Sequence, residues 1–355
     1  MIKKFFGTAI IALFTMTTVF AQTDSTKSLT ISGSVDGYYR WNSGAGNGTT
    51  SFTKSQSAFA LGMATVRADA SALSGKVTAV VDLGFGQRAE EFSYYEYANK
   101  STLSFVKQAY VTLNASKNVK FSMGKWATHV GYEVLDAPLN RNYSMSYMFT
   151  NGPFSHTGIK MDVTAGPVGF MIGVANFIDE TNSTTGVKTL LAQFSGGSAN
   201  GKFKGYLNYA GFFGSNLGTN PLALKSLNQL DLVLTDAISD KFNIGFNATL
   251  QNRKQVVAST SPSGTWYGAA LYLNVDPSAI VGLTLRSEYI SDSKIIYYGT
   301  KNIFANTLSI PCKVGPLTLI PELRFENSQS PIYSKNDGTS SKSTFTALLA
   351  AVYKF

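Results

Sequence analysis

The 355-residue sequence is poor in charge, in cysteine, in proline and in long apolar segments. Charged residues make up 14% of the chain, whereas soluble domains carry about 25%. No apolar run of the roughly 20 residues that a spanning helix needs replaces the missing charge, so a helical membrane protein is excluded outside the extreme N-terminus. The chain is instead rich in Tyr, Phe and Gly and has a mean hydropathy of +0.01. This balance is typical of a transmembrane β-barrel.

The N-terminus has the pattern of an export signal. Lys3 and Lys4 precede an uncharged apolar stretch that ends at Phe20, and the small residue Ala21 then precedes Gln22. This pattern predicts a signal peptide over residues 1–21, cleaved between Ala21 and Gln22. Its loss removes two lysines and lowers the net charge from +9 to +7. The alternative is an uncleaved membrane anchor, for which the apolar core is short.

The rest of the chain is predicted to be a short periplasmic lead-in at residues 22–28 and one barrel domain at residues 29–355. No composition break or linker indicates a second domain. Cys312 is the sole cysteine, so the exported chain relies on no internal disulfide and has no lipid-anchor cysteine near the cleavage site. We interpret it as a small apolar packing residue.

Alternation with period two begins at Leu29, where apolar residues on one face alternate with polar residues on the other as far as Trp41. A strand has this period because successive side chains point to opposite faces. The same pattern recurs at Val77–Phe85, Phe242–Gln251, Tyr267–Val275, Leu317–Glu326 and Phe345–Phe355. Segments near residues 57–73 and 188–198 alternate poorly and are assigned to strands from their spacing.

Short and long connections also alternate along the chain. Seven short turns rich in Gly, Pro, Asn and Asp fall near residues 73–75, 116–118, 165–167, 198–200, 239–240, 276–280 and 314–316. Eight long polar loops fall near residues 42–55, 86–102, 127–155, 178–187, 214–226, 252–264, 291–300 and 327–342. Fifteen connections predict an all-β fold, a transmembrane antiparallel up-and-down β-barrel of about 16 strands (range 14–18), closed because every amide in hydrocarbon must be paired.

The longest loop, residues 127–155, follows the fifth predicted strand and is the candidate constriction, as in sixteen-stranded porins whose loop after the fifth strand folds into the lumen. Its polar and charged residues would set a field across a narrow pore and sort solutes by charge. They are Glu133, Asp136, Asn140, Arg141 and Asn142. The alternative is a loop that packs outside or covers the mouth.

The alternation also predicts which charged side chains face the lumen. The predicted pore-lining residues are Asp36, Arg40, Lys76, Asp82, Lys120, Lys160, Asp162, Lys202, Lys204, Arg286, Glu288, Glu322, Arg324 and Glu326. A water-filled lumen tolerates both signs, whereas a lipid face does not. The net charge of +7 indicates a mild anion preference, or else basic residues on loops and turns that bind lipid head groups.

Signals of other function classes are weak. His129 and His156 flank the longest loop, but two histidines without a third ligand predict structural hydrogen bonds rather than a metal site. Residues 44–48 are glycine-rich but lack the G-x-G-x-x-G spacing, and no G-x-S-x-G occurs. No basic cluster fits nucleic acid. We therefore predict no catalytic residues, no metal and no cofactor.

Several segments resemble the OmpL-like β-barrel porin-2 family of outer-membrane porins found in Bacteroidetes and relatives. They are Gly33–Tyr39, Lys107–Val111, Gly124–Glu133, Asn140–Ser144 and Gly152–Gly158. The resemblance covers most of the chain and is sharpest over residues 104–160. It implies a barrel and porin activity but no specific substrate. The terminal Tyr353 and Phe355 resemble the signal by which the barrel-assembly machinery recognises its clients.

Together these observations predict a porin of the Gram-negative cell outer membrane, a monomer or homotrimer, that lets small hydrophilic solutes diffuse passively through a polar, mixed-charge lumen. Its partners would be outer-membrane lipids and, during insertion, the assembly machinery. One rival is a non-conducting or substrate-specific barrel within a secretion, adhesion or uptake assembly. A membrane-embedded enzyme is disfavoured because histidine is scarce and no catalytic triad is matched.

Overall fold

The computed structural model describes residues 27–355 apart from residues 184, 214–222, 256–262, 293 and 295. The predicted signal peptide, its cleavage site at Ala21 and Gln22, and most of the lead-in lie outside the described residues. None of the described helices is long and apolar enough to cross a membrane.

Strands dominate the described chain. They are β1 (Ser28–Asn42), β2 (Ala58–Ala72), β3 (Val77–Phe85), β4 (Val106–Asn114), β5 (Val119–Ala127), β6 (Ser155–Ala165), β7 (Val168–Ala175), β8 (Thr189–Gly197), β9 (Phe203–Phe213), β10 (Leu224–Ser239), β11 (Phe242–Gln255), β12 (Gly264–Val275), β13 (Leu283–Asp292), β14 (Asn302–Ser309), β15 (Cys312–Val314), β16 (Leu317–Ser328), β17 (Tyr333–Ser334), β18 (Ser340–Ser341) and β19 (Ser343–Lys354).

Sixteen wall strands close into a barrel. Each strand from β1 to β13 pairs antiparallel with the next, β14 pairs with β16, β16 pairs with β19, and β19 pairs back with β1. The segments β14 and β15 both pair with β16 and make one wall strand, interrupted near Pro311, which has no amide hydrogen to donate. The predicted sixteen-stranded, antiparallel up-and-down barrel is confirmed.

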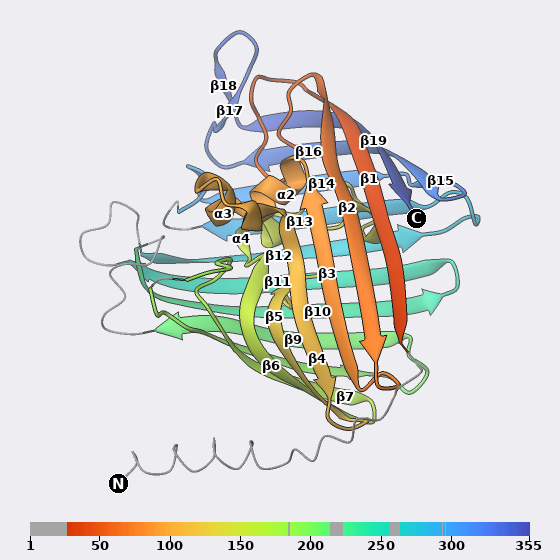
Figure 1. Cartoon of the computed structure of the whole chain (residues 1–355). Helices are drawn as coiled ribbons and strands as arrows, with labels where there is room; N and C mark the ends of the chain where they lie inside the picture. Colours follow the sequence, from red (N-terminus) through yellow and green to blue (C-terminus); the bar gives the residue numbers. More distant parts are fainter. Residues whose placement is uncertain (1–26, 184, 214–222, 256–262, 293, 295) are drawn as a thin grey trace.

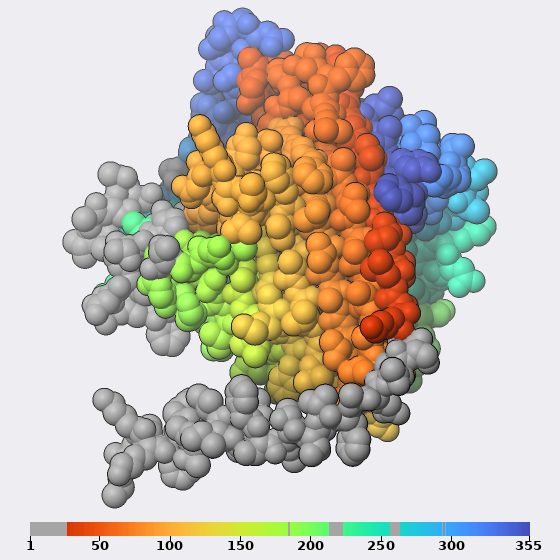
Figure 2. Space-filling model, viewed as in Figure 1, coloured from red at the N-terminus to blue at the C-terminus, as the bar shows by residue number. Residues whose placement is uncertain are grey.

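All seven predicted short turns and all eight predicted long loops separate wall strands. The β3–β4 loop contains α2 (Gln87–Phe92), α3 (Tyr94–Ala98) and η1 (Thr102–Phe105), and the β5–β6 loop contains η2 (Ala137–Leu139) and α4 (Tyr147–Asn151). The helices α2 and α3 and the β17–β18 hairpin gather at one end of the barrel (Figure 1). In Figure 2 the β1–β2 loop and the α2–α3 segment form its rim. We call this the long-loop end and the opposite one the short-turn end.

The two faces of the wall differ as the alternation predicts. On β1, Leu29 and Ile31 are exposed on the outer face, whereas Asp36 and Arg40 are buried on the inner face. The weakly alternating segments form β2 and β8. In β2 the pattern is interrupted because Gly62 is an extra residue opposite Asp36 and Gly37, and a bulge of this kind shifts all later side chains to the other face.

The seam of the barrel, where β19 pairs with β1 to close the wall, includes hydrogen bonds of Phe355. The Phe355 amide donates to the Gly33 carbonyl at 3.0 Å, and the Gly33 amide donates to the Phe355 carbonyl at 3.1 Å. A Cβ atom at Gly33 would collide with the Thr65 carbonyl and the Phe355 ring. Closure at this point therefore requires glycine at position 33.

Candidate functional site: the lumen and its inner loop

Residues 128–154, which join β5 to β6 and which we call the inner loop, cross the lumen from one wall to the other. The Gly131 amide donates to Asp231 on β10 at 2.9 Å. The Tyr132 ring stacks on Tyr272 of β12 with 4.1 Å between centroids. Asp136 forms an ion pair with Lys107 on β4. Contacts to strands on several sides place this loop inside the barrel.

The inner loop also reaches the short-turn end. Arg141 forms an ion pair with Asp276 at 2.7 Å, in the turn between β12 and β13, and donates to Thr284 at 2.8 Å. Asn142 donates to Ser309 on β14 at 2.7 Å. Asn140 instead bonds within the loop.

A network of buried charges on β13 and β16 holds the middle of the inner loop. Arg286 contacts Glu133 at 2.6 Å and Glu288 at 3.2 Å. Arg324 contacts Glu288 at 3.0 Å and Glu326 at 2.9 Å. Burial of charge is costly unless it is paired and hydrogen-bonded. Each charge of this network has an ion-pair partner, but the Nε atoms of Arg286 and Arg324 and Oε1 of Glu288 have no hydrogen-bond partner among the described residues.

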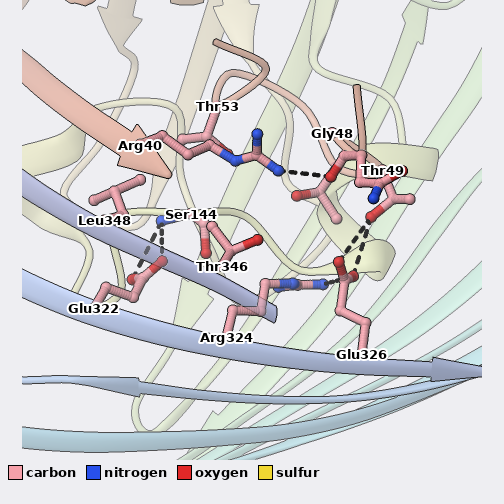
Figure 3. A pocket seen from close by; sticks show the side chains of 12 residues that line it. Arg40, Gly48, Thr49, Thr53, Ser144, Glu322, Arg324, Glu326, Thr346 and Leu348 are labelled. Carbon is pink, nitrogen blue, oxygen red and sulfur yellow. Dashed lines mark hydrogen bonds and ion pairs between the residues drawn. The ribbon is translucent and has the colours of Figure 1, made fainter. Parts of the chain in front are cut away.

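Carboxylates of the same wall also accept backbone amides of the inner loop. The Ser144 amide donates to Glu322 at 3.2 Å and the Tyr147 amide donates to Glu288 at 2.7 Å. Figure 3 shows Glu322 beside Ser144, and Arg324 and Glu326 beneath Thr49 of the β1–β2 loop. A loop that lacks regular structure must satisfy its amides in this way when it is buried.

These contacts change the roles predicted for five wall residues. They face inward as predicted, but the inner loop covers them and their charged groups bind it. They are Arg286, Glu288, Glu322, Arg324 and Glu326, each at most 5% exposed. The charges of the inner loop itself are also paired, at Glu133, Asp136 and Arg141. Each of these charges is thus balanced locally, and a transverse field set by the inner loop stays a prediction.

Three loops pack together at the long-loop end around an apolar group that we call the loop cluster. It contains Phe52, Met63, Ala89, Phe92, Leu135, Met145, Phe149 and Phe154. The residues come from the β1–β2 loop, α2, the inner loop and the inner face of β2. The cluster packs the β1–β2 loop, α2 and the inner loop against β2.

Arg88 of α2 joins this cluster to the inner loop. Its side chain is fully buried, and it donates to the carbonyls of Leu135 at 3.1 Å and Tyr143 at 3.2 Å. Its guanidinium lies 5.2 Å from the Phe52 ring centroid and 4.8 Å from that of Tyr143. The Tyr143 hydroxyl in turn donates to Asp36 on β1, and a side chain at Gly62 would collide with both of these groups.

Asp179 in the β7–β8 loop fixes the exit of the inner loop. One carboxylate oxygen accepts the amides of Phe154 at 2.6 Å and Ser155 at 2.9 Å, and the other accepts the Tyr94 hydroxyl at 3.3 Å. Burial is the main cause that raises the pKa of Asp179, to about 6. This carboxyl group links two loops to the start of β6.

The two histidines lie at the base of the inner loop, with 5.4 Å between ring centroids. His129 bonds to the Tyr209 carbonyl at 3.0 Å, and His156 bonds to the Thr128 hydroxyl at 3.2 Å. Burial lowers the pKa of His129 to about 4, so this ring is neutral at pH 7. Across the described ranges, no three His, Cys, Asp or Glu side chains gather as metal ligands.

Cavities remain open in the short-turn half of the lumen, and two of them are lined by exposed lysines. The first, of about 800 Å³, is lined by β1–β6 and includes Arg67, Asp69, Lys120, Lys160 and Asp162. The second, of about 320 Å³, lies between the tip of the inner loop and the short turns. Its charged lining residues are Arg141, Asp276, Lys313 and Lys354.

The remaining predicted lining residues are distributed over both halves. Arg40 donates to the Asn47 carbonyl in the β1–β2 loop at 2.6 Å, and Asp82 pairs with Lys107 at 3.0 Å. Lys204 is exposed on β9. Lys76 and Lys202 are exposed in short turns rather than in the wall, because their strands start one residue later.

Sequence reasoning missed Lys107, Arg67 and Arg88. Lys107 lies at an irregularity where the β3–β4 register shifts, and Arg67 lies in the weakly alternating β2, so the period-two rule did not assign either to a face. Arg88 lies in a loop helix, where no periodic signal exists.

A closed barrel with a loop folded across its lumen is the architecture of β-barrel channels, and this chain has that architecture. The family model described as "Putative beta-barrel porin-2, OmpL-like" matches residues 28–355. The chain therefore belongs to this family of β-barrel porins, and the resemblance noted in the sequence is confirmed. No curated protein matches the chain.

Solved structures share the fold at low identity. An anion-selective porin from Comamonas acidovorans has 12% identity and a TM-score of 0.61, over 93% of this chain and 100% of that chain. The outer membrane channel DcaP of Acinetobacter baumannii has 15% identity and a TM-score of 0.63, over 93% and 97%. OmpT of Vibrio cholerae has 12% identity and a TM-score of 0.60, over 93% and 98%. These likenesses establish the shared fold.

Proposed function

We propose that this chain lets small hydrophilic solutes diffuse passively across the outer membrane, with its long loops outside the cell and its short turns in the periplasm. The observation that carries the proposal is that the closed wall is apolar on its outer face and polar on its inner face. Apolar side chains such as Leu29 and Ile31 face outward, while polar and charged side chains line cavities within. Lipid requires the first arrangement and water the second. We infer passive flow without an energised or enzymatic step.

The inner loop is the proposed constriction. It touches β4, β10, β12, β13, β14 and β16, and residues 137–141 line the second cavity. A solute that enters from the short-turn end meets this loop before it meets the loop cluster. The size limit of the pore would therefore depend on residues 140–143, which reach deepest.

One observation favours a second candidate function, a substrate-specific or non-conducting barrel within an outer-membrane assembly. The loop cluster is dry and apolar, with Phe52 fully buried and Phe92 and Met145 each 1% exposed. Such packing resists permeation until the loops separate. A pore that opens only for particular solutes would combine this closure with a polar lumen.

The proposed partners follow from the same surfaces. Outer-membrane lipids would cover the apolar wall, and the barrel-assembly machinery would bind the terminal strand through Tyr353 and Phe355. A homotrimer is proposed because trimeric porins share this fold, among them the trimer form of OmpT. The cleaved signal at residues 1–21 would direct export.

Planar-bilayer recording of the refolded mature protein tests the proposed function. Discrete conductance steps, with protein whose gel migration shifts on heating as closed barrels do, support a pore. Steps that grow when residues 140–143 are deleted support the constriction. A folded barrel without any conductance contradicts passive diffusion and favours the second candidate.

A further inference from the structure

The carboxylates that line the two open cavities are all engaged by neighbouring cations. Asp69 pairs with Arg67 at 2.7 Å, Asp162 pairs with Lys160 at 3.1 Å, and Asp276 pairs with Arg141 at 2.7 Å. Each pair is partly exposed and so weakly held, but in each the negative charge is balanced locally. No lining carboxylate of either cavity is left to attract a cation from solution.

Three lysines in the same cavities have no such partner. Lys120 lines the first cavity, and Lys313 and Lys354 line the second. All three are exposed, and none forms an ion pair with any residue between 27 and 355 that the structure describes. Six cationic side chains therefore face three carboxylates across the two cavities.

The turns that form the rim at the short-turn end also carry more positive than negative charge. The turns after β2, β4, β8 and β10 carry the exposed lysines Lys76, Lys117, Lys202 and Lys241. The exposed carboxylate of these turns is Asp240. A solute that approaches from this end thus meets positive charge at the mouth and again inside.

The long-loop half of the lumen cannot sort solutes in the same way. Four of its charges on β13 and β16 are buried and paired with one another or with Glu133, and the inner loop covers them; they are Arg286, Glu288, Arg324 and Glu326. The unpaired lysines that line the two open cavities lie in the short-turn half, whereas the exposed lysines of the long loops, such as Lys301 and Lys335, lie outside these cavities. Low-dielectric walls concentrate the field of such charges and raise the local concentration of ions of opposite sign.

We propose that the pore selects anions, and that unpaired lysines of the short-turn half, above all Lys120, Lys313 and Lys354, set this selectivity instead of the inner loop. The inference rests on the proposed function and names its solute class, small inorganic and organic anions such as chloride, phosphate and carboxylates. The field extends about 10 Å in 0.1 M salt and about 3 Å in 1 M salt. Selectivity therefore weakens as salt rises.

The reversal potential of the refolded mature protein in planar bilayers, under a tenfold KCl gradient, tests the inference. We expect chloride to permeate several-fold better than potassium at or below 0.1 M, with the ratio falling toward one near 1 M. The triple variant K120Q/K313Q/K354Q should lower the ratio about threefold. The matched control K301Q/K335Q/K342Q, which removes three exposed lysines at the long-loop end, should leave it unchanged.

The outcomes separate the inference from the proposed function. A conducting pore with a ratio at or below one overturns anion selectivity and leaves the porin intact. An anion-selective pore whose ratio survives in the triple variant overturns the role of these lysines. A folded barrel that never conducts overturns the proposed function, and the inference falls with it. Heat-shifted gel migration verifies that each variant is folded.

Discussion

Arg88→Ala should loosen the packing that closes the long-loop end. The substitution deletes two hydrogen bonds to the carbonyls of Leu135 and Tyr143 and two ring contacts, all within a fully buried site. A buried carbonyl left without its donor costs about 1–3 kcal/mol, and each cation–π contact contributes about 0.5–2 kcal/mol. The guanidinium regains hydration when the loops separate, which offsets part of this sum.

A net loss of about 3 kcal/mol is therefore the expected effect on docking of α2 against the inner loop. Since 1.4 kcal/mol corresponds to a tenfold change in an equilibrium constant, the undocked population rises by about two orders of magnitude. Arg88→Lys keeps the charge but presents a point donor without the planar fork. Its undocked population should therefore lie between those of the wild type and Arg88→Ala. Tyr97→Ala, an exposed side chain on α3, is the matched control.

Single-channel recording and limited proteolysis together provide the assay. Arg88→Ala should show more frequent or larger openings, and the β3–β4 loop should be cleaved faster than in the wild type. The barrel itself should remain folded, because its wall does not depend on this residue. Equal conductance and equal cleavage in the wild type and in Arg88→Ala would refute the assigned role of Arg88.

Three further predictions concern the loop tip, a buried acid and the seam. Deleting residues 140–143 should increase the size of the largest sugar that permeates, because the deepest part of the constriction is lost. An unchanged size limit would argue against the inner loop as the constriction. Burial raises the pKa of Asp179 to about 6, above the usual value near 3.9. The folded protein therefore favours the protonated carboxyl group, so the contribution of Asp179 to the free energy of unfolding is largest at low pH and is lost as pH rises through 6. Between pH 4 and 6 the midpoint of thermal unfolding should accordingly fall more in the wild type than in Asp179→Asn. An equal change of the midpoint with pH in the two proteins would contradict the raised pKa of Asp179. Gly33→Leu should prevent closure against Phe355 and abolish heat-shifted gel migration, whereas Gly46→Asn should retain it, because this loop position has open space and a left-handed φ of 65° that Asn tolerates.

The fold could be predicted from the sequence because lipid imposes one rule on every wall strand. Outward residues such as Leu29 and Ile31 must be apolar, and this rule made β1 and the terminal strand visible. The same rule is weak in β2, where the extra residue Gly62 shifts the alternation. There the regular spacing of turns still located the strand, because barrel height fixes strand length.

The site was less predictable because its contacts join distant parts of the chain. Alternation indicated that Arg286 and Glu288 face inward, but not that Glu133, 153 positions from Arg286, would cover them. A strand pattern specifies a face and leaves the occupant of the lumen undetermined. Arg88 and Lys107 had no periodic signal, since one lies in a loop helix and the other at a register shift.

The central claim is that this barrel is a passive diffusion pore. Liposome swelling with neutral sugars of graded size, using the refolded mature protein, tests it most directly. The account predicts swelling whose rate declines as sugar size increases and reaches zero at a defined limit. No swelling with any sugar, from protein whose heat-shifted gel migration demonstrates a closed barrel, would contradict it.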